Sequence, residues 1–324
     1  SGYYIIDSKF NLEDHFVFDP LNPLSISTSK LANNSDKSII ISESRVFIAT
    51  NNGFNVFNKK LKTFKRYFKG KKSKLTSNNI IGIEKYGEVL LIASENELVL
   101  FNIASSSFES LVSIPSSIKS LFSSPEGDIF IRALNSDYQV SIDTNSLKIN
   151  PIKAGTIPDT EKITVINNNF LFWNKSSTKV TKTDFNFLNK TTINTNGIIN
   201  SVNADSYTIY FGTNAGVKKL ENENVSVSSF DLFNESNFFY VFENNYINIY
   251  DNTIEIKNSN GEQVYKKKYP INFSEMSFET DKEIIFIGKE DLFVFNISEK
   301  SFTNFLPENL LKGNKIDNLK SIDD

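Results

Sequence analysis

Two side chains in this sequence offer chemistry suited to ligand binding. Arg132, one of only three arginines in 324 residues, stands in the apolar run DIFIRAL (128–134), and Trp173 is the only tryptophan. A guanidinium presents a planar fork of donors to a carboxylate or sulfate, and an indole presents a flat face to a sugar ring. Both residues are therefore candidate ligand contacts. The alternative is that Trp173 fills a core and that Arg132 reaches solvent or pairs with an acid such as Asp137.

The residue types that catalysis and metal binding most often need are scarce. There is no cysteine, and the single histidine, His15, stands in NLEDHFVFD near the N-terminus. One imidazole without thiols cannot supply the usual zinc ligands, and SPEGD (124–128) and NSNGEQ (258–263) carry too few carboxylates for a calcium loop. No phosphate-binding or nucleophile-elbow motif occurs in a suitable context. We expect no metal, no cofactor and no catalytic residue, although the paired carboxylates of a lyase or glycosidase stay an open alternative.

The segments that carry these residues are repeated along the chain. The run VFIATNNGFNVFN (46–58) returns as LLIASENELVLFN (90–102) and IIFIGKEDLFVFN (284–296). Successive equivalents are separated by 44, 39, 41, 39, 37 and 39 residues, at Phe47, Leu91, Phe130, Leu171, Tyr210, Ile247 and Phe286. Each unit divides into four short β-rich runs with turn residues between them. Four antiparallel strands in about 40 residues match the size of one β-propeller blade.

This repeat predicts an all-β fold, a single β-propeller over residues 1–324 with four-stranded antiparallel blades. Seven full repeats are expected at approximately 31–74, 75–115, 116–159, 160–196, 197–235, 236–270 and 271–313. Residues 2–18 resemble the last two strands of a blade and residues 315–324 resemble a first strand, so the two ends could pair as a split closing blade. The propeller would then have seven or eight blades. A parallel β-helix or a pair of β-sandwiches fits the four-strand pattern less well.

The repeat also assigns positions to candidate binding residues. In a propeller, the turn between the second and third strands lies on the same face as the crossover to the next blade, and ligands usually meet that face or the central channel. The expected binding residues in these turns are Asn51, Asn52, Glu95, Asn96, Asn214, Lys289 and Asp291. Turn chemistry by itself also accounts for Asn and Gly there. Arg132 and Trp173 break the repeat, because they replace a small residue found elsewhere as Ala49, Ala93, Gly212 and Gly288.

Charge and hydropathy limit the classes of partner that the chain is expected to bind. The chain has 35 basic and 38 acidic residues, a net charge of −3, and its densest basic run is KRYFKGKKSK (65–74). We interpret that run as a solvated loop and expect no nucleic-acid partner. No apolar stretch approaches the roughly 20 residues that span a bilayer. Membrane attachment is therefore expected only through segments that this sequence does not include.

The motif within the repeat resembles the two-component regulator propeller repeat. Its pattern of N-x-I-x-x-I, a short turn, an apolar I-A/G-T strand and a later S-x-x-F is seen in RVFIATNNGFNVFNKKLKTF (45–64), NNIIGIEKYGEVLLIASENELVLFNIASSSF (78–108) and TIYFGTNAGVKKLE (208–221). The family usually places tryptophan where this chain has Phe47, Leu91, Tyr210 and Phe286. The resemblance implies the periplasmic sensor region of a hybrid two-component system of the Bacteroidetes type.

The function implied by the resemblance is ligand sensing without catalysis. We expect an extracytoplasmic propeller of a two-component signalling protein, in the periplasm or cell envelope, that binds a glycan-derived ligand. Its partner would be a small molecule, an oligosaccharide or another protein domain. The alternative is a cell-envelope scaffold, similar to propellers associated with type IX secretion, that binds a protein or a surface polysaccharide. A propeller lyase or glycosidase is the third possibility.

Overall fold

The computed structural model describes residues 3–6, 12–28, 30–32, 37–143, 146–153, 156–205, 207–221, 226–243, 245–270, 276–279, 283–287 and 292–304. The described residues form strands β1 to β30 and no α-helix, so this part of the chain has no helix that could cross a membrane. The strands are rich in Phe, Ile, Val and Tyr, which suit a pleated and buried surface. They pair as seven four-stranded antiparallel sheets and one two-stranded sheet.

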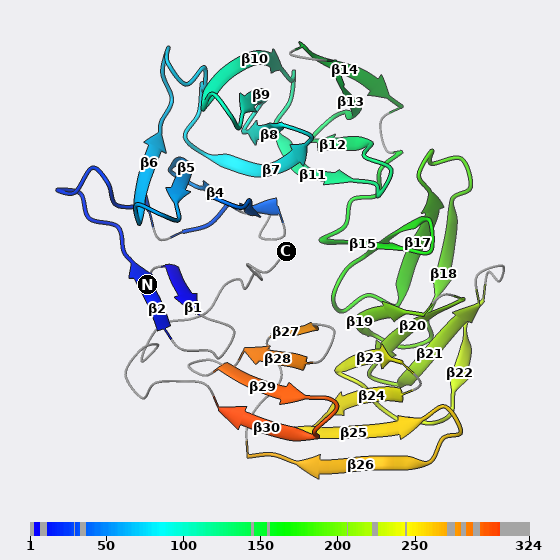
Figure 1. The fold of residues 1–324 in the computed structure, drawn as a ribbon. Helices are drawn as coiled ribbons and strands as arrows, with labels where there is room; N and C mark the ends of the chain where they lie inside the picture. Colours follow the sequence, from blue (N-terminus) through cyan, green and yellow to red (C-terminus); the bar gives the residue numbers. More distant parts are fainter. Residues whose placement is uncertain are drawn as a thin grey trace. The chain divides into compact units, whose positions relative to one another are not determined.

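The chain forms two compact units, and the first extends to Ile157 (Figure 1). It opens with a hairpin of Tyr3–Ile6 (β1) and Leu12–Phe16 (β2). The first blade contains Ile39–Ile41 (β3), Arg45–Thr50 (β4), Gly53–Asn58 (β5) and Thr63–Tyr67 (β6). The second contains Ile80–Tyr86 (β7), Val89–Ser94 (β8), Glu97–Asn102 (β9) and Ser107–Ser113 (β10). The third contains Ile118–Ser123 (β11), Ile129–Ala133 (β12), Asp137–Asp143 (β13) and Ser146–Ile152 (β14).

The second unit begins at Pro158 and contains four further blades. The fourth blade contains Lys162–Ile166 (β15), Asn169–Trp173 (β16), Lys179–Asp184 (β17) and Thr191–Asn194 (β18). The fifth contains Ile199–Ala204 (β19), Thr208–Thr213 (β20), Gly216–Glu221 (β21) and Ser228–Phe230 (β22). The sixth contains Phe238–Phe242 (β23), Asn245–Tyr250 (β24), Thr253–Asn258 (β25) and Gln263–Lys268 (β26). The seventh contains Met276–Glu279 (β27), Glu283–Ile287 (β28), Leu292–Asn296 (β29) and Ser301–Asn304 (β30).

Each four-stranded sheet is made of four strands that are consecutive in sequence, and each falls inside one predicted repeat. The predicted fold class is therefore confirmed: the chain is all-β, with the four-stranded antiparallel blades of a β-propeller. The strand predicted within residues 315–324 lies outside the described residues. The hairpin β1–β2 packs on the first blade, where the ring of Phe16 lies 4.8 Å from that of Phe57 and 5.3 Å from that of Phe64.

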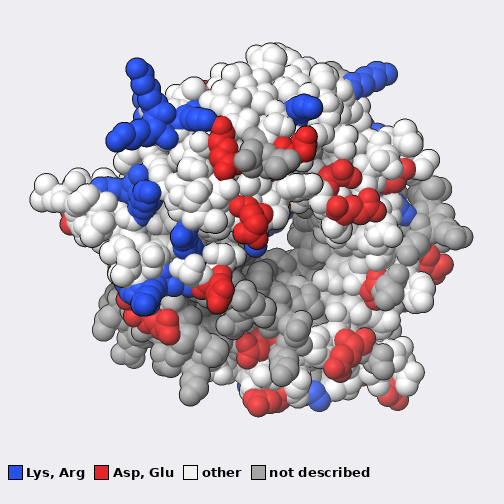
Figure 2. Space-filling model, turned by 45° about the horizontal axis from the view of Figure 1, so that its top comes forward, with Lys and Arg blue, Asp and Glu red and all other residues white. Residues whose placement is uncertain are grey.

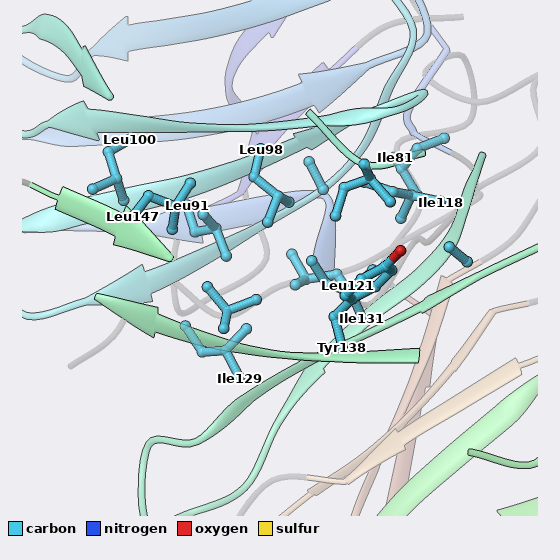
Figure 3. Close-up of a cluster of buried hydrophobic side chains, with 14 of the residues drawn as sticks. Ile81, Leu91, Leu98, Leu100, Ile118, Leu121, Ile129, Ile131, Tyr138 and Leu147 are labelled. Carbon is cyan, nitrogen blue, oxygen red and sulfur yellow. The ribbon is translucent and has the colours of Figure 1, made fainter. Parts of the chain in front are cut away.

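The second blade shows how both faces of a sheet become core. Leu91 and Leu100 belong to a cluster shared with the third blade, which Figure 3 shows in close-up. Their neighbours Leu90 and Phe101 belong to a different cluster, shared with the first blade. Successive side chains on a strand point to opposite faces, so a sheet covered on both sides needs apolar residues at adjacent positions. Runs such as VLLIAS (89–94) meet that requirement.

The same layering continues within the second unit. One cluster joins the fourth and fifth blades through Leu171, Trp173 and Phe211, and another joins the fifth and sixth through Tyr210 and Phe239. A third joins the sixth and seventh blades. Within each unit, neighbouring blades are therefore held together by layers of apolar side chains.

The basic run at residues 65–74 is only in part a loop. Lys65, Arg66 and Tyr67 belong to β6, the last strand of the first blade, and the residues that follow leave the sheet. The interpretation of the whole run as a loop is therefore wrong for its first three residues. Tyr67 explains the difference, because its ring packs on Phe101 and Phe108 of the second blade and keeps the strand in place.

Candidate functional site

The predicted binding turns lie at hairpins between the second and third strands of their blades. All of the predicted turn residues that the structure describes are exposed: Asn51, Asn52, Glu95, Asn96 and Asn214. The first four belong to the first unit and Asn214 to the second. Lys289 and Asp291 lie outside the described residues.

In the first blade, the crossover to the next blade bonds directly to the turn. The Gly53 N–H donates to the carbonyl oxygen of Asn78 at 2.6 Å, and the side-chain amide of Asn78 donates to Asn52 Oδ1 at 3.3 Å. Gly53 has φ of +107°, and a Cβ there would lie 2.6 Å from the carbonyl oxygen of Tyr67. Only glycine fits this position without strain. The turn and the crossover are thus locked together at the backbone.

The turn of the second blade is held in the same way. The carbonyl oxygen of Glu95 accepts from the N–H of Ile118, and that of Asn96 accepts from the N–H of Ile114, both at 2.8 Å. Turns and crossovers therefore share one face in this unit. We call residues 51–52, 77–78 and 95–96 the unit 1 rim.

Buried polar side chains next to the unit 1 rim hold the turn of the first blade in place through hydrogen bonds. Thr50 and Asn55 are both 0% exposed, and Ser27 is 1% exposed. Thr50 Oγ1 donates to the carbonyl oxygen of Gly53 at 2.7 Å, and Asn55 Oδ1 accepts from the N–H of Ser27 at 2.9 Å. Hydrogen bonds between buried groups restrict the turn to one geometry, since breaking them would leave polar atoms away from water.

Glu97 is a residue of this region that sequence reasoning missed. Its side chain is 1% exposed, and its Oε1 accepts from the N–H of Thr76 at 2.6 Å and from Ser94 Oγ at 2.7 Å. The Thr76 hydroxyl donates to the other carboxylate oxygen. A buried carboxylate is tolerated when several donors satisfy it, as here. Through these hydrogen bonds, Glu97 joins the crossover that precedes the second blade to the turn between the second and third strands of that blade.

The signal for Glu97 is visible in the repeat. Gly53 and Gly216 open the third strands of their blades, and Glu97 opens the third strand of its own, ahead of the apolar run LVLF. An acidic residue at the start of such a run points to a buried, hydrogen-bonded carboxylate. Its partners, however, come from the crossover, which the repeat does not identify.

The exposed chemistry of the unit 1 rim is that of amides and one carboxylate. Asn51, Asn52 and Asn96 are exposed and offer both donors and acceptors, Asn78 is half-buried, and Glu95 Oε2 lies 3.5 Å from Ser77 Oγ. Such groups suit a neutral ligand that carries several hydroxyls. Among the described residues, no group of three His, Asp or Glu side chains could hold a metal ion.

Arg132 lies in the first unit, on the second strand of the third blade. It is 9% exposed and stands directly opposite Asp137, which is 3% exposed, in the antiparallel register. The Asp137 carboxylate accepts from the N–H of Ile157 at 3.0 Å. The structure therefore brings Arg132 to the acid named as its alternative partner, and most of its surface is covered by protein.

Trp173 lies in the second unit, so the two residues that break the repeat belong to different units. It is 7% exposed and sits in the core cluster between the fourth and fifth blades. Its indole N–H donates to Thr164 Oγ1 at 3.0 Å. A buried tryptophan usually has such a partner. The small residues found at this position in other repeats are tightly packed: a Cβ on Gly212 would lie 2.4 Å from Ser201 Oγ.

The second unit has a depression of about 490 Å³ that sequence reasoning did not identify. It is lined by the ends of the first strands of three successive blades, and includes Asn167, Asn203 and Asp205. The side-chain amide of Asn167 donates to the carbonyl oxygen of Asp205 at 3.1 Å. Asn167 is distant in sequence from Asn203 and Asp205, so only the packing of the blades brings it to them.

Asp205 anchors the wall of this depression. Its Oδ1 accepts from the N–H groups of Tyr207 and Thr208 at 2.8 and 2.7 Å, and its Oδ2 accepts from the Tyr210 hydroxyl at 2.9 Å. Burial, together with hydrogen bonds to Tyr246 and Asp205, raises the pKa of the Tyr210 hydroxyl. Tyr210 therefore stays protonated and acts as a fixed donor, not as a base.

Comparison with known proteins supports the fold. No family model matches the chain, and no curated protein matches it. Among solved structures it is similar to dihydro-heme d1 dehydrogenase NirN in complex with DHE, at a TM-score of 0.60 and 10% identity, over 93% of this chain and 69% of that one. It is also similar to BamB from Moraxella catarrhalis, at a TM-score of 0.52 and 11% identity, over 86% and 91%.

A third similar structure is the extracellular domain of a proposed hybrid two component system from B. thetaiotaomicron. The TM-score is 0.42 at 14% identity, over 91% of this chain and 48% of that one. At 10% and 11% identity, the similarities to NirN and BamB show a shared β-propeller fold, and function has to be argued from the sites.

Proposed function

We propose that this chain is a non-catalytic, ligand-binding β-propeller of a two-component signalling protein, and that it recognises a glycan-derived ligand on the unit 1 rim. The observation that carries the proposal is the combination of exposed amide and carboxylate side chains with a backbone held by buried hydrogen bonds. Gly53, Thr50 and Glu97 fix the turns and the crossover, so Asn52 and Glu95 are presented with little conformational freedom. Preorganised polar groups lose less entropy when a ligand binds.

The choice of ligand follows from the groups available. Amide side chains donate and accept hydrogen bonds at the same time, as sugar hydroxyls do. The signalling role and the envelope location rest on the resemblance of the repeats to two-component regulator propellers. A polar rim also agrees with recognition of a water-soluble ligand.

The proposal is tested by a thermal-shift screen against neutral and acidic oligosaccharides. A ligand at ~100 times its Kd stabilises the folded state by about 2.7 kcal/mol. We expect Asn52→Ala and Glu95→Gln to reduce that stabilisation. Asn260→Ala, at an exposed turn between β25 and β26, is the matched control and should leave it unchanged. The proposal fails if no oligosaccharide stabilises the chain, or if the two rim variants respond as the unaltered chain does.

Arg132 and Trp173 require separate variants because both are largely buried. Arg132→Lys and Trp173→Phe change the chemistry of each side chain with limited loss of volume. If either residue contacts the ligand, its variant should weaken the ligand-induced shift. If each has a structural role, the variant should lower the melting temperature without ligand and leave the shift intact.

A further inference from the structure

A depression of about 630 Å³ follows β6, the last strand of the first blade. Its volume lies in the range of roughly 300–1,000 Å³ typical of ligand sites. The lining includes every residue of β6, together with Leu24, Leu61 and Ser106. It lies within the first unit and shares no residue with the unit 1 rim.

The charge of this depression differs from that of the chain. Arg45, Lys65 and Arg66 line it, and no acidic residue does. It thus contains two of the three arginines in a chain whose net charge is −3. None of these three cations forms an ion pair with a carboxylate in the described part of the chain. In Figure 2, Lys and Arg side chains gather at the left of the view, on the side where Figure 1 places β6.

One of the cations is held firmly in place. Nη1 of Arg45 donates to the carbonyl oxygen of Ile103 at 2.7 Å and to Ser106 Oγ at 2.8 Å. These two bonds use one nitrogen of the five-donor guanidinium and orient the rest of it. A fixed guanidinium is well suited to a carboxylate, because its geometry is set before the ligand arrives.

Exposed apolar side chains accompany the positive charge. Leu24 is 55% exposed and Leu61 is 67% exposed, and both line the depression. Phe68, which also lines it, is 40% exposed. Adjacent exposed apolar groups beside polar ones are typical of an interaction surface. The occupant should therefore carry apolar side chains as well as negative charge.

The backbone of β6 has an open edge at this place. The N–H of Phe64 points away from β5 and donates to the carbonyl oxygen of Leu24 at 2.9 Å. Backbone groups alternate along a strand, so Arg66, two residues on, directs its N–H and C=O the same way. No other described segment bonds to these two groups.

Side chains from both faces of the strand line the depression. Tyr67 lies on the face toward the second blade, where it packs on Phe101, and Lys65 shares that face by alternation. Phe64 lies on the other face, against Phe16, and Arg66 shares that one. A depression lined from both faces runs along the edge of the strand, which is where an added strand would pair.

We propose that this edge docks an extended, acidic peptide segment of a partner protein, which pairs with β6 as a fifth strand. Its backbone bonds Arg66, its carboxylates meet the Arg66 side chain while Arg45 and Lys65 add positive charge nearby, and its apolar side chains cover Leu24, Leu61 and Phe68. An anionic polysaccharide would use the three cations but would leave the apolar groups and the strand edge without partners. The inference goes beyond the proposed rim function because it concerns a different surface and a different class of ligand.

The test measures fluorescence anisotropy of a labelled eight-residue peptide, (Asp-Leu)4, added to the full chain. We expect saturable binding that weakens with salt, and no binding of (Lys-Leu)4. Arg66→Glu should weaken binding by about tenfold or more, since charge-assisted hydrogen bonds are replaced by repulsion. Lys190→Glu makes the same charge change at an exposed residue of the second unit and should have little effect. Melting temperatures establish that both variants are folded.

Two further probes separate strand pairing from simple charge attraction. In a strand, alternate N–H groups point to opposite edges. One peptide is therefore N-methylated at its odd-numbered residues, which blocks one edge, and a second peptide at its even-numbered residues, which blocks the other edge. We expect one of the two methylated peptides to lose binding and the other to retain it. The proposal is overturned if (Asp-Leu)4 does not bind, or if the Arg66→Glu variant binds it normally. It is also overturned if neither methylated peptide loses binding. A last contrary outcome is that polygalacturonate displaces the peptide and binds more tightly than the peptide does.

Discussion

The carboxylate of Glu97 joins two segments that lie 21 residues apart. It accepts hydrogen bonds from Ser94 in its own hairpin and from Thr76 in the preceding crossover. Because the carboxylate is removed from water, each of these bonds replaces hydration that it has lost. At the residue scale, Glu97 is therefore the main positioning group of the unit 1 rim.

We expect Glu97→Ala to lower the free energy of unfolding by about 2–4 kcal/mol, because it leaves the buried hydroxyl of Ser94 and the backbone N–H of Thr76 without their acceptor. Glu97→Gln should recover only part of this loss, since its NH₂ group would face a donor. Urea denaturation of each variant measures the effect. Glu95→Gln, exposed in the same turn, should stay within about 0.5 kcal/mol. A loss below that value for Glu97→Ala would contradict the assignment.

His15 provides a pH-dependent prediction because it is the only histidine. Its ring stacks on that of Tyr4, with ring centroids 4.1 Å apart, and partial desolvation, followed by the charge of the N-terminus, lowers its pKa from 6.5. The folded state therefore favours the neutral ring more than the unfolded state does. As pH falls from above 6.5 through the folded pKa, the unfolded state takes up the proton first and stability declines.

The single histidine signal in an NMR titration measures this pKa directly. We expect a midpoint below 6.5, and a higher midpoint in Tyr4→Ala, which uncovers the ring. His15→Phe keeps the stack and should remove the corresponding pH dependence of stability near neutral pH. A midpoint at or above 6.5 in the unaltered chain would contradict the lowered pKa of His15.

At the scale of elements, the first and second blades are joined by aromatic side chains. Phe101 lies at the centre of this contact, with ring centroids 5.2 Å from Phe54, 5.0 Å from Phe108 and 5.6 Å from Tyr67. Tilted and edge-on rings at such separations add to the gain from apolar burial. The blades of this unit are thus held to each other by side chains, while hydrogen bonds hold the strands within each blade.

We expect Phe101→Ala to cost about 3–5 kcal/mol of unfolding free energy, because it opens a cavity between two sheets that cannot close fully around it. Phe101→Leu should cost less, as it fills most of the space. Tyr207→Ala, at a residue that is 79% exposed, is the control and should change stability little. Denaturant midpoints give all three values, and a small effect of Phe101→Ala would mean that this interface contributes little.

At the scale of the whole molecule, the chain combines two compact units with one repeat that extends through both. The boundary between the units, at Ile157 and Pro158, falls at the end of the third repeat. The sequence predicts a single propeller over the whole chain. In such a fold each blade depends on its neighbours, so the loss of one interface should destabilise blades in both units.

Fluorescence of Trp173 can show whether the two units unfold together, because Trp173 is the only tryptophan of the chain and lies in the second unit. We expect Phe101→Ala, a change in the first unit, to lower the denaturant midpoint of Trp173 fluorescence as much as that of far-UV circular dichroism. A single propeller predicts one shared transition. An unchanged Trp173 midpoint would instead show that the two units unfold independently.

The sequence by itself determined the fold class, the four-strand blades and the exposed turns at Asn51, Asn52, Glu95, Asn96 and Asn214. These features are local, because alternating side chains and turn residues act over a few positions and the repeat copies them along the chain. The buried acceptor role of Glu97, the burial of Trp173 and the open edge beside Arg66 were decided by tertiary structure. Each depends on residues distant in sequence, such as Thr76, Thr164 and Leu24, which meet only when strands pair and sheets stack.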